Sequence, residues 1–260
     1  MHLITLNQFR FIILLFLFLT CFSHCSPLYY YLLQTPQENE KPYLTQILTT
    51  LLVGGNLVTQ TGGGIGVPVI YPWGTFTDQN NGTVLFQGNA GTFGGQVYST
   101  STLIFPKCAS GQTWEQGTNT CTPTLPPTFR YCSANDNSCN DAGTLLLNGT
   151  GISEIWTECT TLTLAGRTWR PATKNEMKLT LFCADTPTTI SIDNGASCGS
   201  VGRKINTTLF PYDLTKQLRY WTSSAVNATT GWYINYGTGT AISGDSKNVF
   251  NYVRCISDGP

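Results

Sequence analysis

The first hydrophobic pattern in the chain is an unbroken apolar run, Phe11–Leu19, which directly follows Arg10. A helix that spans a bilayer needs roughly 20 apolar residues, so this run is too short to cross one. A basic residue followed by a short apolar run is typical of a secretory signal. We therefore expect residues 1–25 to form an export signal. No later stretch is long and apolar enough to predict a membrane-spanning helix.

The pattern then changes twice before the middle of the chain. Residues 26–40 are mostly polar, and residues 41–53 predict a short helix that ends at Gly54-Gly55. From Asn56 to Phe105, short runs of Val, Thr, Phe and Tyr are interrupted by glycines, which indicates short strands joined by tight turns. We expect residues 26–106 to be a glycine-rich, mainly β region.

The C-terminal half combines one helix start with two alternating stretches. Thr173 and Glu176 have the spacing of a capping box, which predicts a helix from Lys174 to about Cys183. Apolar and polar residues alternate over 231–236 and again over 249–256, which predicts two strands of one sheet.

Cysteine usage changes this picture, because the chain has ten cysteines, two of them near the signal. An even number of the others in an exported chain predicts disulfides rather than zinc ligands, since none of these cysteines shows C-x-x-C spacing. The eight are Cys108, Cys121, Cys132, Cys139, Cys159, Cys183, Cys198 and Cys255. Residues 107–141 are rich in Cys and Pro and poor in apolar residues, so we expect disulfides to order this segment. Closeness in sequence favours Cys108 with Cys121 and Cys132 with Cys139, although four cysteines allow three connectivities.

The two early cysteines suggest how the mature chain is attached. Cys21 and Cys25 each end a loose version of the motif that precedes a lipid-modified cysteine, and Cys21 fits slightly better. The alternative is cleavage after Ser23, which would give a plainly secreted or periplasmic protein. We expect a lipoprotein at the outer membrane or cell surface, attached by its lipid anchor alone.

Composition and charge exclude several classes of function. The two histidines, His2 and His24, lie in or beside the signal, which excludes His-based nucleophilic catalysis and His-ligated metals in the folded part. Charged residues make up 11% of the chain and balance to zero, so nothing indicates binding to nucleic acid. Residues 195–199 match the hydrolase motif G-x-S-x-G, but no histidine base follows them. We expect no enzyme activity and no cofactor.

Three further motifs each have a structural interpretation beside a functional one. Glu154 and Glu158 could act as paired acids in glycoside hydrolysis, but their neighbours favour an amphipathic helix with both acids in solvent. Residues 135–141 are rich in Asn and Asp, which indicates a solvated turn more than a calcium site. Four Asn-x-Thr sequences match glycosylation acceptors and more simply indicate polar turns. They begin at Asn81, Asn148, Asn206 and Asn227.

Basic and aromatic residues supply the candidate binding surface. From Thr160 onward, ten Lys or Arg residues stand against six Asp or Glu, so this half could present a basic face to sulfate or carboxylate groups. The candidates are Arg170, Lys174, Lys178, Arg203, Lys204, Lys216, Arg219 and Lys247, with Tyr220 and Tyr233 expected to show a polar edge. Trp169, Trp221 and Trp232 could stack on sugars but are expected mainly in the core.

Five ordered motifs carry a resemblance to a known family. They are Gly166-Arg167-Thr168-Trp169-Arg170, Thr173-Lys174-Asn175-Glu176, Tyr220-Trp221-Thr222-Ser223-Ser224, Gly231-Trp232-Tyr233-Ile234-Asn235-Tyr236 and Tyr252-Val253-Arg254-Cys255-Ile256. Together they resemble the Lcl C-terminal domain, named after a bacterial collagen-like adhesin and shared by surface lipoproteins of unknown function. The match covers about half of the chain. The chain departs from the family at Pro171-Ala172, and it has no collagen-like repeats.

The resemblance implies a fold, two disulfides and a kind of ligand. It implies a C-type-lectin-like domain with Cys159 bonded to Cys255, which leaves Cys183 for Cys198. Because the adhesin's domain binds sulfated polysaccharides, it also implies contact with glycosaminoglycans. We therefore expect an α+β protein in which residues 142–260 form a C-type-lectin-like domain, preceded by the glycine-rich β region and the cysteine-rich linker at 107–141.

The expected function is adhesion to host or matrix glycans or proteins. One alternative is a structural envelope protein without a ligand of its own. A second is an enzyme of the fold of the formylglycine-generating enzymes, although the matching region shows no evident unpaired cysteine.

Overall fold

The computed structural model describes residues 66–182, 190, 193, 205–212 and 218–259. These residues all belong to one compact unit of the chain. Residues 1–25, which are expected to form the export signal and include Cys21 and Cys25, lie outside the described residues, as does the helix predicted at 41–53.

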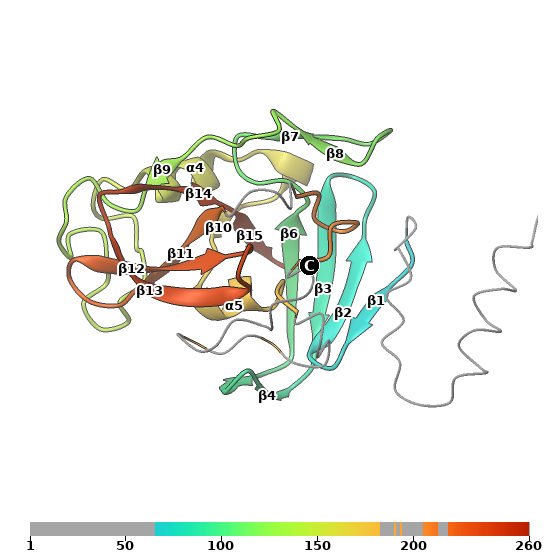
Figure 1. Cartoon of the computed structure of the whole chain (residues 1–260), viewed down its shortest axis with the longest axis horizontal. Helices are drawn as coiled ribbons and strands as arrows, with labels where there is room; N and C mark the ends of the chain where they lie inside the picture. Colours follow the sequence, from blue (N-terminus) through green and yellow to red (C-terminus); the bar gives the residue numbers. More distant parts are fainter. Residues whose placement is uncertain (1–65, 183–189, 191–192, 194–204, 213–217, 260) are drawn as a thin grey trace, which may run out of the picture. The chain divides into compact units, whose positions relative to one another are not determined.

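The larger of two main sheets has six strands and combines the two ends of the described chain (Figure 1). Its order is β1 (Val69–Tyr71), β2 (Gly74–Asp78), β3 (Thr83–Gly88), β6 (Ser101–Pro106), β15 (Cys255–Asp258) and β10 (Arg170–Pro171). All neighbouring strands are antiparallel. The strands predicted from the glycine-interrupted pattern are therefore confirmed over the described part of that region.

The second main sheet has five strands, four from the C-terminal half and one from the linker. Its order is β13 (Thr240–Ser246), β12 (Thr230–Asn235), β11 (Arg219–Ala225), β14 (Phe250–Val253) and β9 (Phe129–Arg130). The β11–β14 pair is parallel, and the other pairs are antiparallel. Two small hairpins complete the β structure: β4 (Gly91–Phe93) with β5 (Gln96–Tyr98), and β7 (Thr113–Glu115) with β8 (Thr120–Thr122).

Helix is scarce among the described residues, which show only α4 (Glu154–Thr161), α5 (Lys174–Lys178) and the 3₁₀ turn η2 (Leu164–Gly166). The capping box at Thr173 is confirmed, because its hydroxyl accepts from the Glu176 N–H while the Glu176 carboxylate accepts from the Thr173 N–H. The predicted length to Cys183 is wrong. Tight i→i−3 bonds close the helix at Leu179 and Thr180, and Leu181 then pairs with Ile205 across a β-bridge.

The predicted α+β class with a C-type-lectin-like C-terminal domain is wrong. The described chain is mainly β, with fifteen strands and two short α-helices. The six-stranded sheet joins strands from residues 69–106 to strands from residues 170–171 and 255–258. The boundaries expected at 106 and 141 therefore do not separate independent sheets, because both sheets need strands from more than one of the predicted segments.

The alternation over 249–256 proves to be two strands in two different sheets. β14 ends at Val253 and β15 begins at Cys255, so the chain passes from the five-stranded to the six-stranded sheet at Arg254. The Arg254 side chain is buried, and its guanidinium donates to the carbonyl oxygens of Pro106 and Lys107 at 2.6 and 2.9 Å. The strands over 231–236 and 250–253 do share one sheet, as predicted, with β11 between them.

Three disulfides fasten the described chain, and each confirms a predicted pair. Cys108–Cys121 and Cys132–Cys139 close short loops, while Cys159–Cys255 joins α4 to the start of β15 across 96 residues. The last four of these cysteines are fully buried. Cys183 and Cys198 lie outside the described residues.

The core consists of two clusters of buried side chains. One is dominated by aromatic residues of the six-stranded sheet, such as Phe76, Phe86 and Phe105. The other surrounds two of the disulfides and contains Tyr131 and Trp221. No helix of the described residues is long and apolar enough to cross a membrane.

Candidate functional site

Two clefts lie beside the β7–β8 hairpin, which the Cys108–Cys121 disulfide fastens at its base. The first, which we call the tryptophan cleft, has a volume of about 430 Å³. It is lined by Asn81, Gly82, Pro106, Cys108, Ala109, Ser110, Gly111, Gln112, Thr113, Trp114, Leu162, Thr163, Leu164 and Ala165. Small-molecule sites fall in the range of about 300–1,000 Å³, so the cleft is large enough to hold a ligand of that kind.

The second cleft, which we call the tyrosine cleft, has a volume of about 330 Å³. It is lined by Gln112, Asn119, Thr120, Cys121, Thr124, Pro126, Thr207, Pro211, Tyr212, Leu218 and Tyr220. Gln112 belongs to both linings. Its side-chain amide donates to the Pro123 carbonyl at 2.6 Å and accepts from the Ala109 N–H at 3.1 Å. It therefore connects the segment before β7 with the segment after β8.

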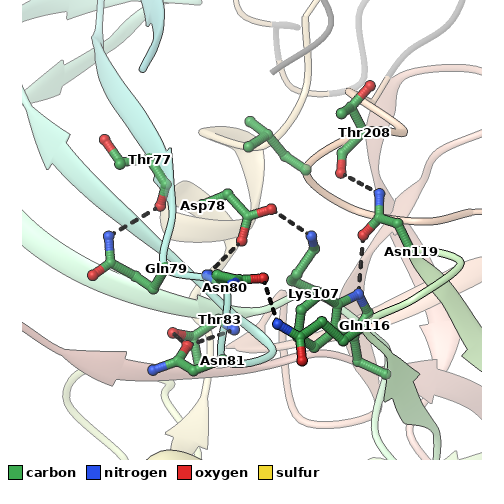
Figure 2. Close-up of polar contacts among 12 residues, drawn as sticks. Thr77, Asp78, Gln79, Asn80, Asn81, Thr83, Lys107, Gln116, Asn119 and Thr208 are labelled. Carbon is green, nitrogen blue, oxygen red and sulfur yellow. Dashed lines mark hydrogen bonds and ion pairs between the residues drawn. The ribbon is translucent and has the colours of Figure 1, made fainter. Parts of the chain in front are cut away.

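Side chains of the hairpin fix it to the rest of the unit (Figure 2). Asn119, at the hairpin turn, donates to the Thr208 carbonyl at 2.8 Å, and Gln116 donates to Asn80 at 3.0 Å. Asn119 has a φ of +48°, a left-handed conformation that Asn adopts more readily than most residues. The hairpin is therefore held by side chains as well as by its disulfide.

Trp114 is the large aromatic side chain of the tryptophan cleft, and three contacts set its position. Its Nε1–H donates to Asn119 Oδ1 at 2.9 Å, and the Lys107 ammonium lies 4.5 Å from its ring centroid. Gly82, with a φ of +84°, passes close to the ring: a Cβ at this position would lie 3.5 Å from Trp114 Cε3. The half-buried ring is thus held in one orientation, and a fixed ring can bind a ligand without a large loss of side-chain entropy.

The described linings of both clefts combine apolar side chains with polar ones and carry no charge. They contain no Asp, Glu, Lys, Arg or His, and their two cysteines are bonded to each other. Amide and hydroxyl groups of Asn81, Thr113 and Thr163 supply polarity in the tryptophan cleft. In the tyrosine cleft, burial raises the pKa of Tyr220 well above its usual value, so this phenol stays protonated. The clefts are therefore suited to hydrogen bonding and ring stacking.

The structure places three of the basic candidates in ion pairs at α5. Arg170 makes two bonds to Glu176, at 2.9 and 2.7 Å, and one to Asp258 at 2.7 Å. The bonds to Glu176 raise the pKa of Arg170. Lys174 and Lys178 come together on the Asp193 carboxylate, with Lys178 at 2.8 Å. Burial of the Lys178 amine lowers its pKa, although Asp193 acts in the opposite direction.

Lys247 was expected at the surface, but its side chain is buried in a cage of oxygen atoms. Its ammonium donates to the Asp136 carbonyl at 3.1 Å, Asn137 Oδ1 at 3.2 Å and Asn140 Oδ1 at 2.7 Å. The Asn- and Asp-rich turn thus surrounds an internal lysine. Burial lowers the pKa of Lys247. Within the described residues, no cluster of three or more His, Cys, Asp or Glu is placed to hold a metal ion.

The remaining described candidates lie at the five-stranded sheet. Arg219, about half exposed, pairs with Asp245 at 3.3 Å and lies 5.1 Å from the Tyr233 ring centroid. Tyr220 and Tyr233 are only 2% and 7% exposed, so the expected polar edges are wrong. Each is packed against aromatic or basic neighbours within the sheet, which leaves little of either phenol at the surface.

The three tryptophans follow the structural interpretation, but the paired acids follow it only in part. Trp169 and Trp221 are buried in the core, while Trp232 is partly buried under the Lys174 ammonium at 4.2 Å. Glu154 and Glu158 both lie on α4 as expected, but both are half-buried and not in solvent. Glu154 accepts from the Arg130 N–H at 2.8 Å. Burial raises the pKa of Glu158.

Arg203, Lys204, Lys216 and the motif at 195–199 lie outside the described residues. The four Asn-x-Thr sequences are described, and they confirm the prediction of polar turns. In each, the Asn Oδ1 accepts from the backbone N–H of the Thr two residues later.

No family model, curated protein or solved structure matches this chain. The resemblance to the Lcl C-terminal domain therefore stays a prediction.

Apart from Tyr220, the described binding candidates named from the sequence do not line the clefts. Trp114 lies between Cys108 and Cys121 in a segment with few other large apolar residues. The sequence did offer one indication of a binding residue. Trp114 is an aromatic residue in a disulfide-closed segment that builds no core of its own. The partners Asn81 and Thr163 could not be found in this way, because they come from segments distant in sequence.

Proposed function

We propose that this chain is an exported surface lipoprotein whose β unit binds an uncharged, sugar-like ligand in the tryptophan cleft. The composition of that cleft is the observation that supports the proposal. A fixed indole ring offers an apolar face, and neutral amide and hydroxyl groups lie around it. Sugars combine apolar ring faces with many hydroxyl groups, so they suit an aromatic face flanked by neutral donors and acceptors.

Export is supported by the oxidised cysteines. Disulfides persist in oxidising compartments outside the cytosol, and three pairs join the described residues. The short apolar run before Cys21 agrees with export followed by lipid attachment at Cys21, with Cys25 as the alternative. Labelled fatty acid should enter the wild-type chain and the Cys25→Ser variant, but not Cys21→Ser. Incorporation into the wild-type chain and Cys21→Ser, but not into Cys25→Ser, would move the anchor to Cys25. No incorporation into the wild-type chain would contradict the anchor.

The charge arrangement favours a neutral ligand over a sulfated one. Each of the five described basic candidates already has carboxylate or other oxygen partners. A sulfate group that bound to one of them would have to compete with these internal partners, and at Lys178 and Lys247 it would also have to reach a buried amine. For this reason the proposal places the ligand in the cleft and not on a basic face.

A cleft-filling substitution tests this function directly. Thr163 is exposed in the lining, and Thr168, five residues later, is exposed outside it. The assay is an array that carries both neutral and sulfated glycans. The wild-type protein and the Thr168→Trp variant should both bind the same neutral glycans. Thr163→Trp should lose this binding because its indole occupies the cleft.

The array also separates the proposal from its alternatives. Retention on sulfated glycans alone, with sensitivity to salt, would favour the basic-face interpretation and contradict ours. Equal binding by both variants would place the ligand elsewhere.

A further inference from the structure

Asp78 and Lys107 form an unusually enclosed contact beneath the tryptophan cleft. Lys107 Nζ lies 2.6 Å from Asp78 Oδ2, and the two side chains are only 1% and 6% exposed. Asp78 ends β2, and Lys107 directly follows β6. Figure 2 shows the two side chains pointing at each other. The Trp114 ring covers the amine at 4.5 Å, so little water can reach the contact.

This enclosure has removed both groups of the pair from water, which is costly for charged side chains even when they are paired. An amide made from the same two groups carries no charge and fits the same enclosed space. Condensation would therefore remove two buried charges and keep the connection between the strands.

The atoms are already placed for such a reaction. Cγ of Asp78 is one covalent bond beyond Oδ2, so the Lys107 amine lies close to the carbon that it would attack. The other carboxyl oxygen, Oδ1, accepts from the backbone N–H of Asn80 at 2.9 Å. This donor would stabilise negative charge on Oδ1 as the carbon becomes tetrahedral.

We propose that Lys107 and Asp78 are joined by an intramolecular amide bond. The Lys107 ammonium first passes a proton to Oδ2, which leaves a neutral amine beside a neutral carboxylic acid. Nζ attacks Cγ, and the carbonyl electron pair moves to Oδ1, held by the Asn80 N–H. A second proton passes from Nζ to Oδ2. The electron pair on Oδ1 then re-forms the carbonyl as the Cγ–Oδ2 bond breaks, and one water leaves. No oxidant, reductant or further reactant is required.

Other lysine contacts of the described chain are less suited to this reaction. Lys174 and Lys178 share a single carboxylate, Asp193, which is 21% exposed. Each amine there competes with the other, and water can reach the carboxylate. Asp78 has Lys107 as its one ion-pair partner among the described residues.

An amide here would link β2 directly to the end of β6, two strands that do not pair with each other. β2 and β6 both pair with β3, and Lys107 immediately precedes the Cys108–Cys121 disulfide. The bond would fix the base of the hairpin that carries Trp114 even after reduction of the disulfide.

Peptide mapping of the mature wild-type protein tests the bond. The protein is reduced, alkylated, unfolded and digested with chymotrypsin. We expect a branched peptide that joins the sequences around Asp78 and Lys107 and is lighter than their sum by one water. Peptides that contain Lys178 and Asp193 should be unlinked. Recovery of the Asp78 and Lys107 peptides as separate, full-mass species would overturn the proposal.

A matched variant adds a second measurement. Lys107→Arg keeps the positive charge but lacks the reactive amine, so its digest should contain no branched peptide. On a reducing denaturing gel the wild-type chain should run faster than this variant, because the internal bond limits its extension. Equal mobility of the two chains would contradict the bond. The wild-type peptide map decides the question even if the variant does not fold.

Discussion

The Cys159–Cys255 disulfide should contribute more to stability than any other described bridge, because it closes the longest loop. The perturbation is the double substitution of Cys159 and Cys255 by Ala. The matched control replaces Cys132 and Cys139 in the same way. All four cysteines are fully buried, so the loss of packed sulfur is similar in the two variants.

The magnitude follows from the loops that the bridges close. Their sequence separations are 96 and 7 residues. In the chain-entropy model these loops correspond to about 4.7 and about 2.4 kcal/mol of stabilisation. The packing terms of the two variants largely cancel, so the expected difference in the free energy of unfolding is about 2.3 kcal/mol. For a unit of this size that difference lowers Tm by about 5 to 9 °C.

The assay is urea unfolding followed by tryptophan fluorescence, with thermal unfolding measured alongside. The variant that lacks Cys159–Cys255 should unfold at the lower urea concentration and the lower temperature. If the two variants had equal midpoints and equal m-values, loop length would not be what sets the contribution of these bridges. A larger loss in the Cys132–Cys139 variant would refute the reasoning outright.

Three other perturbations have defined outcomes. Lys247→Met should lower the free energy of unfolding by about 1–3 kcal/mol in urea unfolding, because buried oxygens lose their donor; an unchanged midpoint would argue against the oxygen cage. Thr173→Ala should lower it by about 1 kcal/mol in thermal melts, while Thr173→Ser should keep the cap of α5. Burial raises the pKa of Tyr131 and of Tyr220, so their stabilising contribution is present below the unfolded pKa of about 10 and is lost as the pH rises above it. Tyrosinate absorbance should therefore appear together with alkaline unfolding, and a smooth rise in the folded protein would contradict their burial.

The sequence alone determined features that depend on near neighbours. The cap at Thr173 needs only Glu176, three residues later, and it formed as predicted. The Cys132–Cys139 pair could be predicted because the two cysteines lie seven residues apart. The Asn-x-Thr turns likewise close on themselves within two residues.

Only the tertiary structure decided which distant segments meet. Alternation over 249–256 predicted strand, but it could not show that Arg254 would divide that strand between two sheets. Lys247 is charged and was therefore expected at the surface, yet a turn more than a hundred residues away in the sequence surrounds its amine. The tryptophan cleft, too, draws Asn81, Trp114 and Thr163 from three separate segments. The free energy of each of these contacts depends on packing summed over the whole unit, and a local pattern contains no information about that sum.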